Sequence, residues 1–151
     1  MPPWSFGVTP DTAVQVDRAV AENAVGWEEL LAIALISVID DDESSRISLA
    51  SLMRSLGFRV NTYASADDFV NSGTHNSTQC IISDLQMPGT SGIQLKRWLD
   101  AQSCRTPVIM ITARPEARLH AQAIASGAFC LLKKPFDAAA LVENVEKALG
   151  V

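Results

Sequence analysis

The stretch Ile36–Glu43 (ISVIDDDE) runs from an apolar segment directly into four consecutive acidic residues. Two carboxylates about 4 Å apart repel each other by ~1 kcal/mol in bulk water and by ~4 kcal/mol near a protein surface. An arrangement with this cost needs a compensating partner, and the simplest partner is a cation. The stretch therefore predicts a buried strand that ends at a cation site.

The composition is that of an ordinary globular domain. Of the 151 residues, 48% are hydrophobic and 19% are charged, which does not fit a disordered chain. The net charge of -5 and the lack of a Lys/Arg-rich run argue against direct binding to nucleic acid. The longest nearly apolar run, Leu30–Ile39, is too short to span a membrane. Three cysteines without metal-type spacing are typical of a reducing compartment, so we expect a cytoplasmic protein.

From residue 35 onward, apolar strand-like runs alternate with amphipathic helix-like runs. The predicted strands are Leu35–Ile39, Arg59–Tyr63, Cys80–Ser83, Val108–Thr112 and Phe129–Leu132. The predicted helices are Ser44–Leu56, Ala66–Asn71, Gly92–Ala101, Glu116–Ser126 and Ala138–Leu149. This alternation predicts an α/β fold, a doubly wound parallel sheet of five strands flanked by five helices.

Residues 1–34 precede this pattern and are predicted to form a separate N-terminal extension. Met1–Pro10 is rich in proline and small residues, which favours irregular structure. From about Asp11, apolar residues recur at helical spacing, at Val16, Val20, Ala24, Trp27 and Leu31. The expected organisation is a helical extension over 1–34 and a globular domain over 35–151.

Reactive polar residues lie at the carboxyl ends of four of the five predicted strands. Asp40 and Asp41 follow the first strand, Asp84 follows the third, Thr112 is the last residue of the fourth, and Lys134 lies just beyond the fifth. In open parallel sheets, ligands bind beyond the carboxyl ends of the strands. Carboxylates suit Mg²⁺, and a carboxylate can also act as the nucleophile that forms an acyl phosphate. A lysine and a hydroxyl would stabilise the transferring group.

From about Leu35 to Leu149 the chain resembles the receiver domain of two-component response regulators. The resemblance rests on pieces that occur in the family's order: Asp40-Asp41, Asp84-x-x-Met87-Pro88-x-x-x-Gly92, Thr112-Ala113 and Lys134-Pro135-Phe136. It implies the flavodoxin-like fold of the chemotaxis regulators. It also implies a phosphorylation-activated switch that takes part in its own phosphotransfer and slow autodephosphorylation but is not otherwise an enzyme.

The resemblance assigns roles to the acidic residues. Asp84 would accept phosphate from the phosphohistidine of a histidine kinase or phosphotransfer protein. Asp41 and Asp84 would bind Mg²⁺ directly, together with the backbone carbonyl of Gln86. Asp40 would act mainly through water. Asp42 has no role in this scheme, and we interpret it as a turn or cap residue.

The resemblance also assigns roles around the phosphoryl group. Lys134 would pair with that group, and the Lys134–Pro135 peptide would be cis. Thr112 would bond a phosphoryl oxygen and reposition its loop. Gln86 and Arg114 each lie two residues beyond a site residue, where they would set the lifetime of the phosphate. The family often has a rotating aromatic residue where this chain has Leu131, so the usual signal relay is in question.

Two kinds of alternative stay open. In a small phosphohydrolase of the haloacid-dehalogenase type, Asp40-x-Asp42-x-Ser44 would supply the nucleophile, but Met87-Pro88 and Lys134-Pro135 would be unexplained. Within the receiver interpretation, the chain is either a stand-alone receiver acting on an unknown output protein or a domain cut from a DNA-binding regulator. Its output surface is expected within 116–149, where a homodimer could also form.

Overall fold

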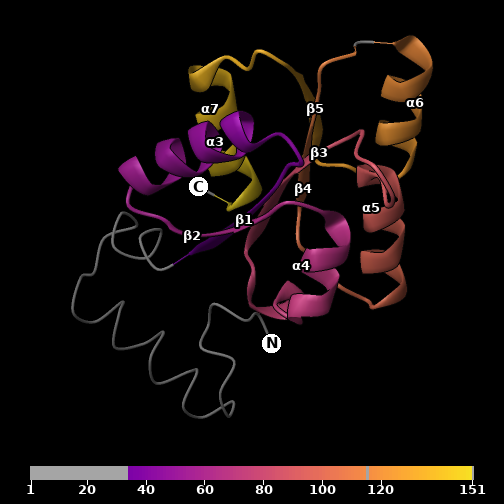
Figure 1. Ribbon diagram of the computed structural model, residues 1–151, viewed down its shortest axis with the longest axis horizontal. Helices are drawn as coiled ribbons and strands as arrows, with labels where there is room; N and C mark the ends of the chain where they lie inside the picture. Colours follow the sequence, from indigo (N-terminus) through magenta and orange to yellow (C-terminus); the bar gives the residue numbers. More distant parts are fainter. Residues whose placement is uncertain (1–33, 115, 151) are drawn as a thin grey trace.

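The computed structural model describes residues 34–114 and 116–150. In this part, five parallel strands form one sheet in the order β2-β1-β3-β4-β5 (Figure 1). The strands are β1 (Leu35–Ile39), β2 (Arg59–Tyr63), β3 (Cys80–Asp84), β4 (Val108–Thr112) and β5 (Cys130–Lys133). The helices are α3 (Glu43–Ser55), α4 (Ala66–Ser72), α5 (Gly92–Ala101), α6 (Ala117–Ala125) and α7 (Ala138–Ala148), with a 3₁₀ turn η2 (His75–Ser77). The predicted flavodoxin-like α/β fold is confirmed.

Element boundaries differ from the sequence prediction by one residue in several places. β3 includes Asp84, which is paired with Ile111 of β4, and β5 is shifted forward because its ladder pairs Thr112 with Lys133. Helix α3 begins at Glu43 because Asp42 caps it, its carboxylate accepting the Ser44 N–H at 3.2 Å. Asp42 is thus the cap residue that the sequence indicated.

The predicted extension over 1–34 and its helix lie outside the described residues, apart from Ala34. The division of the chain at residue 35 therefore stays a prediction. Among the helices that the structure describes, none has both the length and the apolar character needed to cross a membrane.

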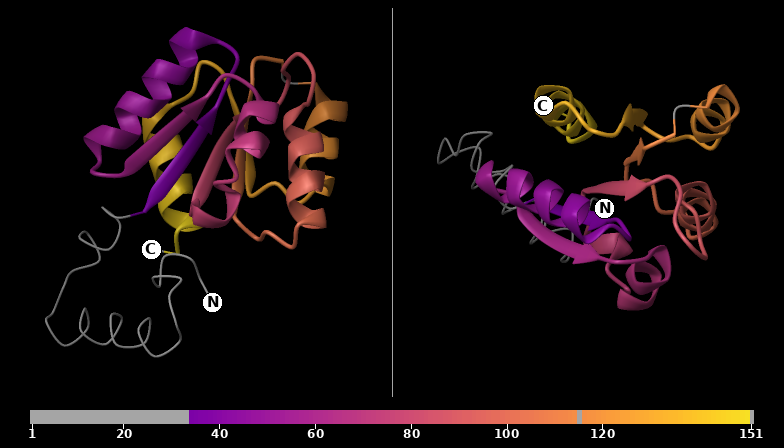
Figure 2. Two further views of the ribbon diagram at one scale, coloured as in Figure 1. Left: turned by 60° about the horizontal axis from the view of Figure 1, so that its bottom comes forward. Right: turned by 45° about the horizontal axis from the view of Figure 1, so that its top comes forward.

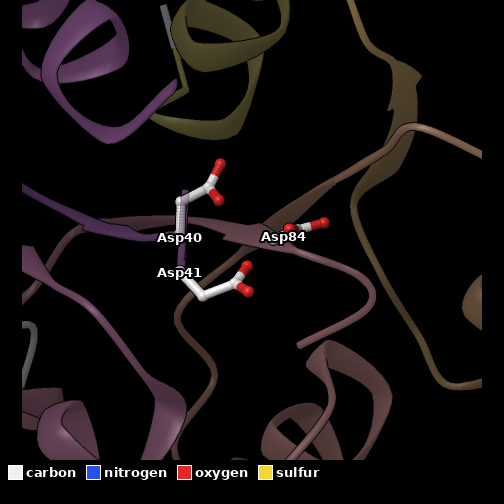
Figure 3. Close-up of side chains that lie close together, drawn as sticks. All are labelled: Asp40, Asp41 and Asp84. Atoms are coloured by element: carbon white, nitrogen blue, oxygen red, sulfur yellow. The ribbon is translucent and has the colours of Figure 1, made fainter. Parts of the chain in front are cut away.

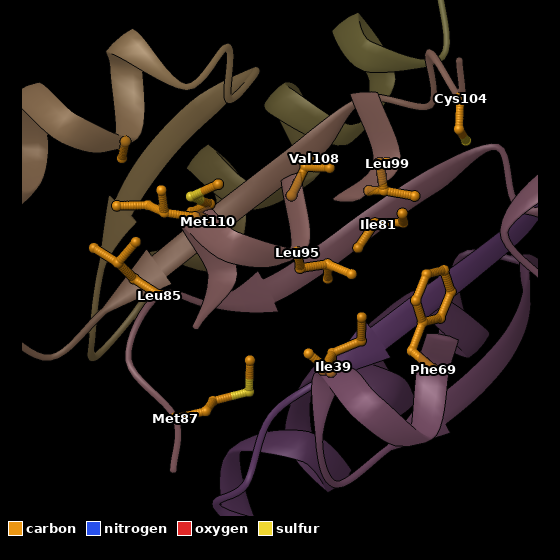
Figure 4. Packing of buried hydrophobic residues seen from close by; sticks show 13 residues of the cluster. Ile39, Phe69, Ile81, Leu85, Met87, Leu95, Leu99, Cys104, Val108 and Met110 are labelled. Atoms are coloured by element: carbon orange, nitrogen blue, oxygen red, sulfur yellow. The ribbon is translucent and has the colours of Figure 1, made fainter. Parts of the chain in front are cut away.

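Helices cover both faces of the sheet. Helices α3 and α7 pack on one face, and α4, α5 and α6 pack on the other (Figures 1 and 2). The three central strands β1, β3 and β4 are buried along their whole length, which is why they read as continuous apolar runs, whereas the edge strand β2 is largely exposed. Figure 4 shows the core on the α4–α6 face, where Phe69, Leu95 and Met110 are completely buried. Each such side chain contributes about 1.5–3 kcal/mol to folding.

The connections that leave β1 and β3 run in opposite directions along the edge of the sheet. β1 pairs with β2 on one side and with β3 on the other, so the connections that leave β1 and β3 diverge at the carboxyl edge. Divergence of this kind opens a crevice at the strand ends, where α/β sheets bind their ligands. The acidic residues at the ends of β1 and β3 therefore meet in the position expected for a site.

Gly92 brings the start of α5 against the end of β3. Its backbone N–H donates to the carbonyl of Leu85 at 3.0 Å. A Cβ atom on residue 92 would lie 2.7 Å from the Asp84 carbonyl oxygen and 3.2 Å from the Leu85 Cα. These neighbours are backbone atoms and cannot rotate away, so a side chain here would push Asp84 out of place.

Gly92→Ala should therefore destabilise the protein, by about 1–3 kcal/mol, as overpacking usually does. Helix propensity alone predicts the opposite sign, because alanine is favoured over glycine in helices by about 1 kcal/mol. Urea unfolding of the two proteins measures the difference. An unchanged or increased stability of the variant would contradict the close packing described above.

Candidate functional site

Three carboxylates meet at the carboxyl edge of the sheet. Asp40 and Asp41 follow β1, and Asp84 ends β3. One oxygen from each lies within 4.8 Å of the others (Figure 3). Asp40 is completely buried, Asp84 is 8% exposed and Asp41 is exposed. The structure thus brings together the three acidic side chains that the sequence predicted as a site.

Asp40 is fixed from several sides. Its Oδ1 accepts the backbone N–H of Asp42 at 2.9 Å, and its own N–H donates to the Tyr63 carbonyl at 3.1 Å. Its carbonyl oxygen accepts a hydrogen bond from Nη1 of Arg46 at 2.7 Å. Because these bonds hold both the side chain and the backbone, Asp40 has little freedom to move toward a ligand.

Arg46 was not predicted from the sequence. It lies on α3 four residues after the cap Asp42, and helical side chains lean toward the N-terminus of their helix. A cation at that position in a helix that follows an acidic cluster is a signal that could have identified it. The guanidinium brings positive charge to the backbone of the acid cluster.

Lys134 links two of the acidic side chains. Its Nζ lies 2.9 Å from Oδ2 of Asp40 and 3.3 Å from Oδ2 of Asp84. Its backbone N–H donates to the Thr112 carbonyl at 2.7 Å, which ties the ends of β4 and β5 together. The Lys134–Pro135 peptide is cis, as the resemblance implied. The neighbouring Lys133 is exposed and forms no ion pair among the described residues.

The pKa values reflect this crowding. Burial raises the pKa of Asp84 from 3.8 to about 6, with a further contribution from the charge of Asp40, while Lys134 opposes the shift. Burial alone would lower the pKa of Lys134, but its contacts with Asp40 and Asp84 outweigh burial and raise it. Without a cation, the site therefore holds a charged lysine and an Asp84 that is reluctant to ionise.

Thr112 is buried at 2% exposure, and its hydroxyl is engaged within its own loop. Its Oγ1 accepts the Arg114 N–H at 3.0 Å and donates to the Arg114 carbonyl at 3.1 Å. These bonds would have to be exchanged before the hydroxyl could bind a ligand. The side chains of Arg114 and Gln86 are exposed, and the Gln86 N–H donates to Oδ1 of Asp84 at 3.4 Å.

Leu131 is half-buried and packs against the core on the α4–α6 face of the sheet. Phe129, two residues earlier, is 41% exposed and precedes β5. The aromatic side chain therefore lies at the surface, while an aliphatic one fills the inner position.

The raised pKa of Asp84 predicts a pH dependence of folding in magnesium-free buffer. Between pH 4 and 6 the folded protein keeps a proton on Asp84 that the unfolded chain has released, so wild-type stability falls as the pH rises through 6. Asp84→Asn removes this loss, so its stability relative to wild type should rise by roughly 2 kcal/mol between pH 4 and 7.5.

Urea unfolding across this pH range, with a chelator present, measures the effect. Glu146→Gln, which neutralises an exposed acid on α7, is the control and should leave the wild-type pH profile in place. A pH profile shared by wild type and Asp84→Asn would show that Asp84 titrates alike in the folded and unfolded states.

Comparisons with known proteins agree with this arrangement. The family model for the response regulator receiver domain matches residues 36–146. The transcriptional regulatory protein FixJ of Azorhizobium caulinodans is 39% identical over 115 residues, covering 76% of this chain and 54% of that protein. The transcriptional regulatory protein TdiR of Thauera aromatica is 34% identical over 116 residues, covering 77% and 51%. The chain thus spans about half the length of these relatives.

Solved structures show the same relationship. The crystal structure of FixJ-N has a TM-score of 0.70 and 30% identity, covering 77% of this chain and 93% of that one. The response regulator StyR has a TM-score of 0.72 and 37% identity, covering 78% and 59%. The family match agrees with the fold, with the acidic residues at two strand ends and with the lysine before a cis proline. The chain therefore belongs to the response regulator receiver domain family.

Proposed function

We propose that the domain over residues 35–151 is a phosphorylation-activated switch of a two-component system, with Asp84 as the phosphoacceptor. The observation that carries this proposal is the difference in access between two buried acids that share one lysine. The side chain of Asp84 is 10% exposed, whereas that of Asp40 is 1% exposed. Only a carboxylate that can be reached from outside can attack a phosphoryl donor.

The same geometry argues against the phosphohydrolase alternative. That alternative requires Asp40 as the nucleophile. Both oxygens of Asp40 already face protein groups, the Asp42 N–H and the Lys134 ammonium. We therefore infer that Asp84 is the residue that reacts, while the buried Asp40 holds Lys134 in place.

The acid cluster has the ligand chemistry of a Mg²⁺ site. Asp41 and Asp84 would hold the ion directly with the carbonyl of Gln86, and Asp40 would bind it through water. Oxygen ligands from one or two carboxylates are what this hard cation takes in proteins. When bound, it would neutralise the charge of the acids and of the incoming phosphoryl group.

In the reaction, an oxygen of Asp84 would form a bond to phosphorus as the phosphorus–nitrogen bond of a donor phosphohistidine breaks. The bonding electron pair would stay on the imidazole nitrogen, and the product would be an acyl phosphate. Lys134 would keep its place beside Asp84 and pair with a phosphoryl oxygen. The partner that supplies phosphate would be a histidine kinase or phosphotransfer protein of the same cytoplasmic system.

The signal would leave the site through Thr112. Its hydroxyl would exchange the Arg114 backbone for a phosphoryl oxygen, which would move the loop that leads to α6. With Leu131 in place of an aromatic residue, the change would pass through packing of β5 and α6. Ile124 and Phe129 are 49% and 41% exposed in this region, which supports a partner or homodimer surface within 116–149. FixJ and TdiR are transcriptional regulatory proteins of which this chain covers about half, which supports the alternative of a receiver cut from a DNA-binding regulator.

Acetyl phosphate with Mg²⁺ tests the phosphoacceptor. Wild type should gain one phosphoryl group, detected by mass spectrometry, and Asp84→Asn should gain none because the nucleophilic oxygen is lost. Asp40→Asn also removes one acid from the cluster but keeps the nucleophile, so it should still gain a phosphoryl group, although more slowly because Asp40 would help to bind Mg²⁺. Phosphate release that survives Asp84→Asn but stops in Asp40→Asn would point to the hydrolase instead.

The exposed Gln86 and Arg114 side chains are expected to control the lifetime of the acyl phosphate. Both would face the space from which water attacks and offer it a hydrogen bond, so Gln86→Ala and Arg114→Ala should each change the dephosphorylation rate, by about two- to ten-fold. Decay of labelled protein after removal of the donor gives the rate. Rates equal to wild type in both variants would remove these residues from the mechanism.

A further inference from the structure

The loop between β3 and α5, residues 85–91, is bridged to a helix outside the acid cluster. Oγ1 of Thr90 donates a hydrogen bond to Oδ1 of Asp67 at 2.8 Å. Asp67 belongs to the first turn of α4 and lies 23 residues earlier in the chain. A Cβ atom on Gly89, whose φ is +79°, would lie 3.8 Å from the other oxygen of Asp67. The Asp67 carboxylate therefore faces two successive residues of the loop.

The ends of this loop are held by other contacts. The backbone N–H of Leu85 donates to the carbonyl oxygen of Ile111 at 2.8 Å, and Ser91 caps the N-terminus of α5 with a capping box. Between these ends, Met87 is 9% exposed and packs in the core. Within the part of the chain that the structure describes, the bond from Thr90 to Asp67 is the hydrogen bond that joins residues 87–90 to another element. Together with the burial of Met87, this hydrogen bond therefore acts as a tether that fixes the position of the middle of the loop.

We propose that Asp67 is a positioning residue for the metal-binding loop, acting through Thr90. The proposal rests on the proposed function, because Gln86 in this loop is the residue that would offer its carbonyl to Mg²⁺. With the tether in place, the carbonyl is held ready for the ion and less order is lost on binding. Without it, the loop samples other positions and the ion binds more weakly. Neither Asp67 nor Thr90 touches the ion or the phosphoryl group.

The chain supplies a matched control in Asp68. It lies in the same helical turn, carries the same charge and is exposed. Its backbone N–H is bonded to Ser65, and its carboxylate has no hydrogen bond among the described residues. Asp67→Ala and Asp68→Ala therefore remove equal charge near the site, but only the first removes the tether.

Titration of the full 151-residue chain with Mg²⁺ by calorimetry tests the proposal. Asp67→Ala and Thr90→Val should each weaken Mg²⁺ binding by about three- to ten-fold, which is the range expected for the loss of one ordinary, solvent-exposed hydrogen bond. Asp68→Ala should match wild type. Asp67→Asn and Thr90→Ser keep an acceptor and a donor and should restore most of the affinity. The double variant should bind no more weakly than either single variant, since both remove the same bond.

Amide hydrogen exchange without metal gives a second measurement. The N–H groups of residues 86–90 should exchange faster in Asp67→Ala and Thr90→Val than in Asp68→Ala. Equal affinity and equal exchange in Asp67→Ala and Asp68→Ala would overturn the proposal. A wild-type protein that binds no Mg²⁺ would instead defeat the proposed function, and the exchange data would still decide whether Asp67 holds the loop.

Discussion

The repulsion among three neighbouring carboxylates is the constraint on which the site depends. Asp40, Asp41 and Asp84 have oxygens within 4.8 Å of one another, and two of these side chains are buried. Lys134 offsets part of the repulsion through contacts with Asp40 and Asp84. Burial, and to a smaller extent the charge of Asp40, still raise the pKa of Asp84. The apo site is therefore held in a state of unfavourable energy that a cation relieves.

The rest of the fold supplies the stability that makes this state tolerable. The central strands β1 and β3 are buried on both faces, so their ends cannot splay apart to relieve the charges. Gly92 allows α5 to approach the Asp84 backbone closely, and the Lys134 N–H is bonded to the Thr112 carbonyl. Packing that is far from the acids thus fixes the distance between them.

Much of this arrangement could be predicted from the sequence because local patterns determine it. Apolar runs that end in acids, a hydroxyl or a lysine place those residues at one edge of a parallel sheet, and the order of the motifs identified the family. What could not be predicted depends on side-chain direction and on contacts between distant elements. The bond from Arg46 to the Asp40 carbonyl and the bond from Thr90 to Asp67 are of this kind. The inward packing of Leu131 beside an exposed Phe129 also required the register of β5.

The contact of Lys134 with two acids fixes the charge balance of the site. Three carboxylates and one ammonium leave an excess of two negative charges, which one divalent ion would cancel. Conversion of a carboxylate to an acyl phosphate would add about one more negative charge. Among the described residues, Arg46 also brings a cation to this cluster, but it bonds the Asp40 backbone and not a carboxylate, so the added charge would have to be met largely by neutral donors. The buried hydroxyl of Thr112 is such a donor, and the added negative charge would attract it. Movement of this hydroxyl toward the acyl phosphate would therefore couple the modification of Asp84 to the position of the Thr112 loop.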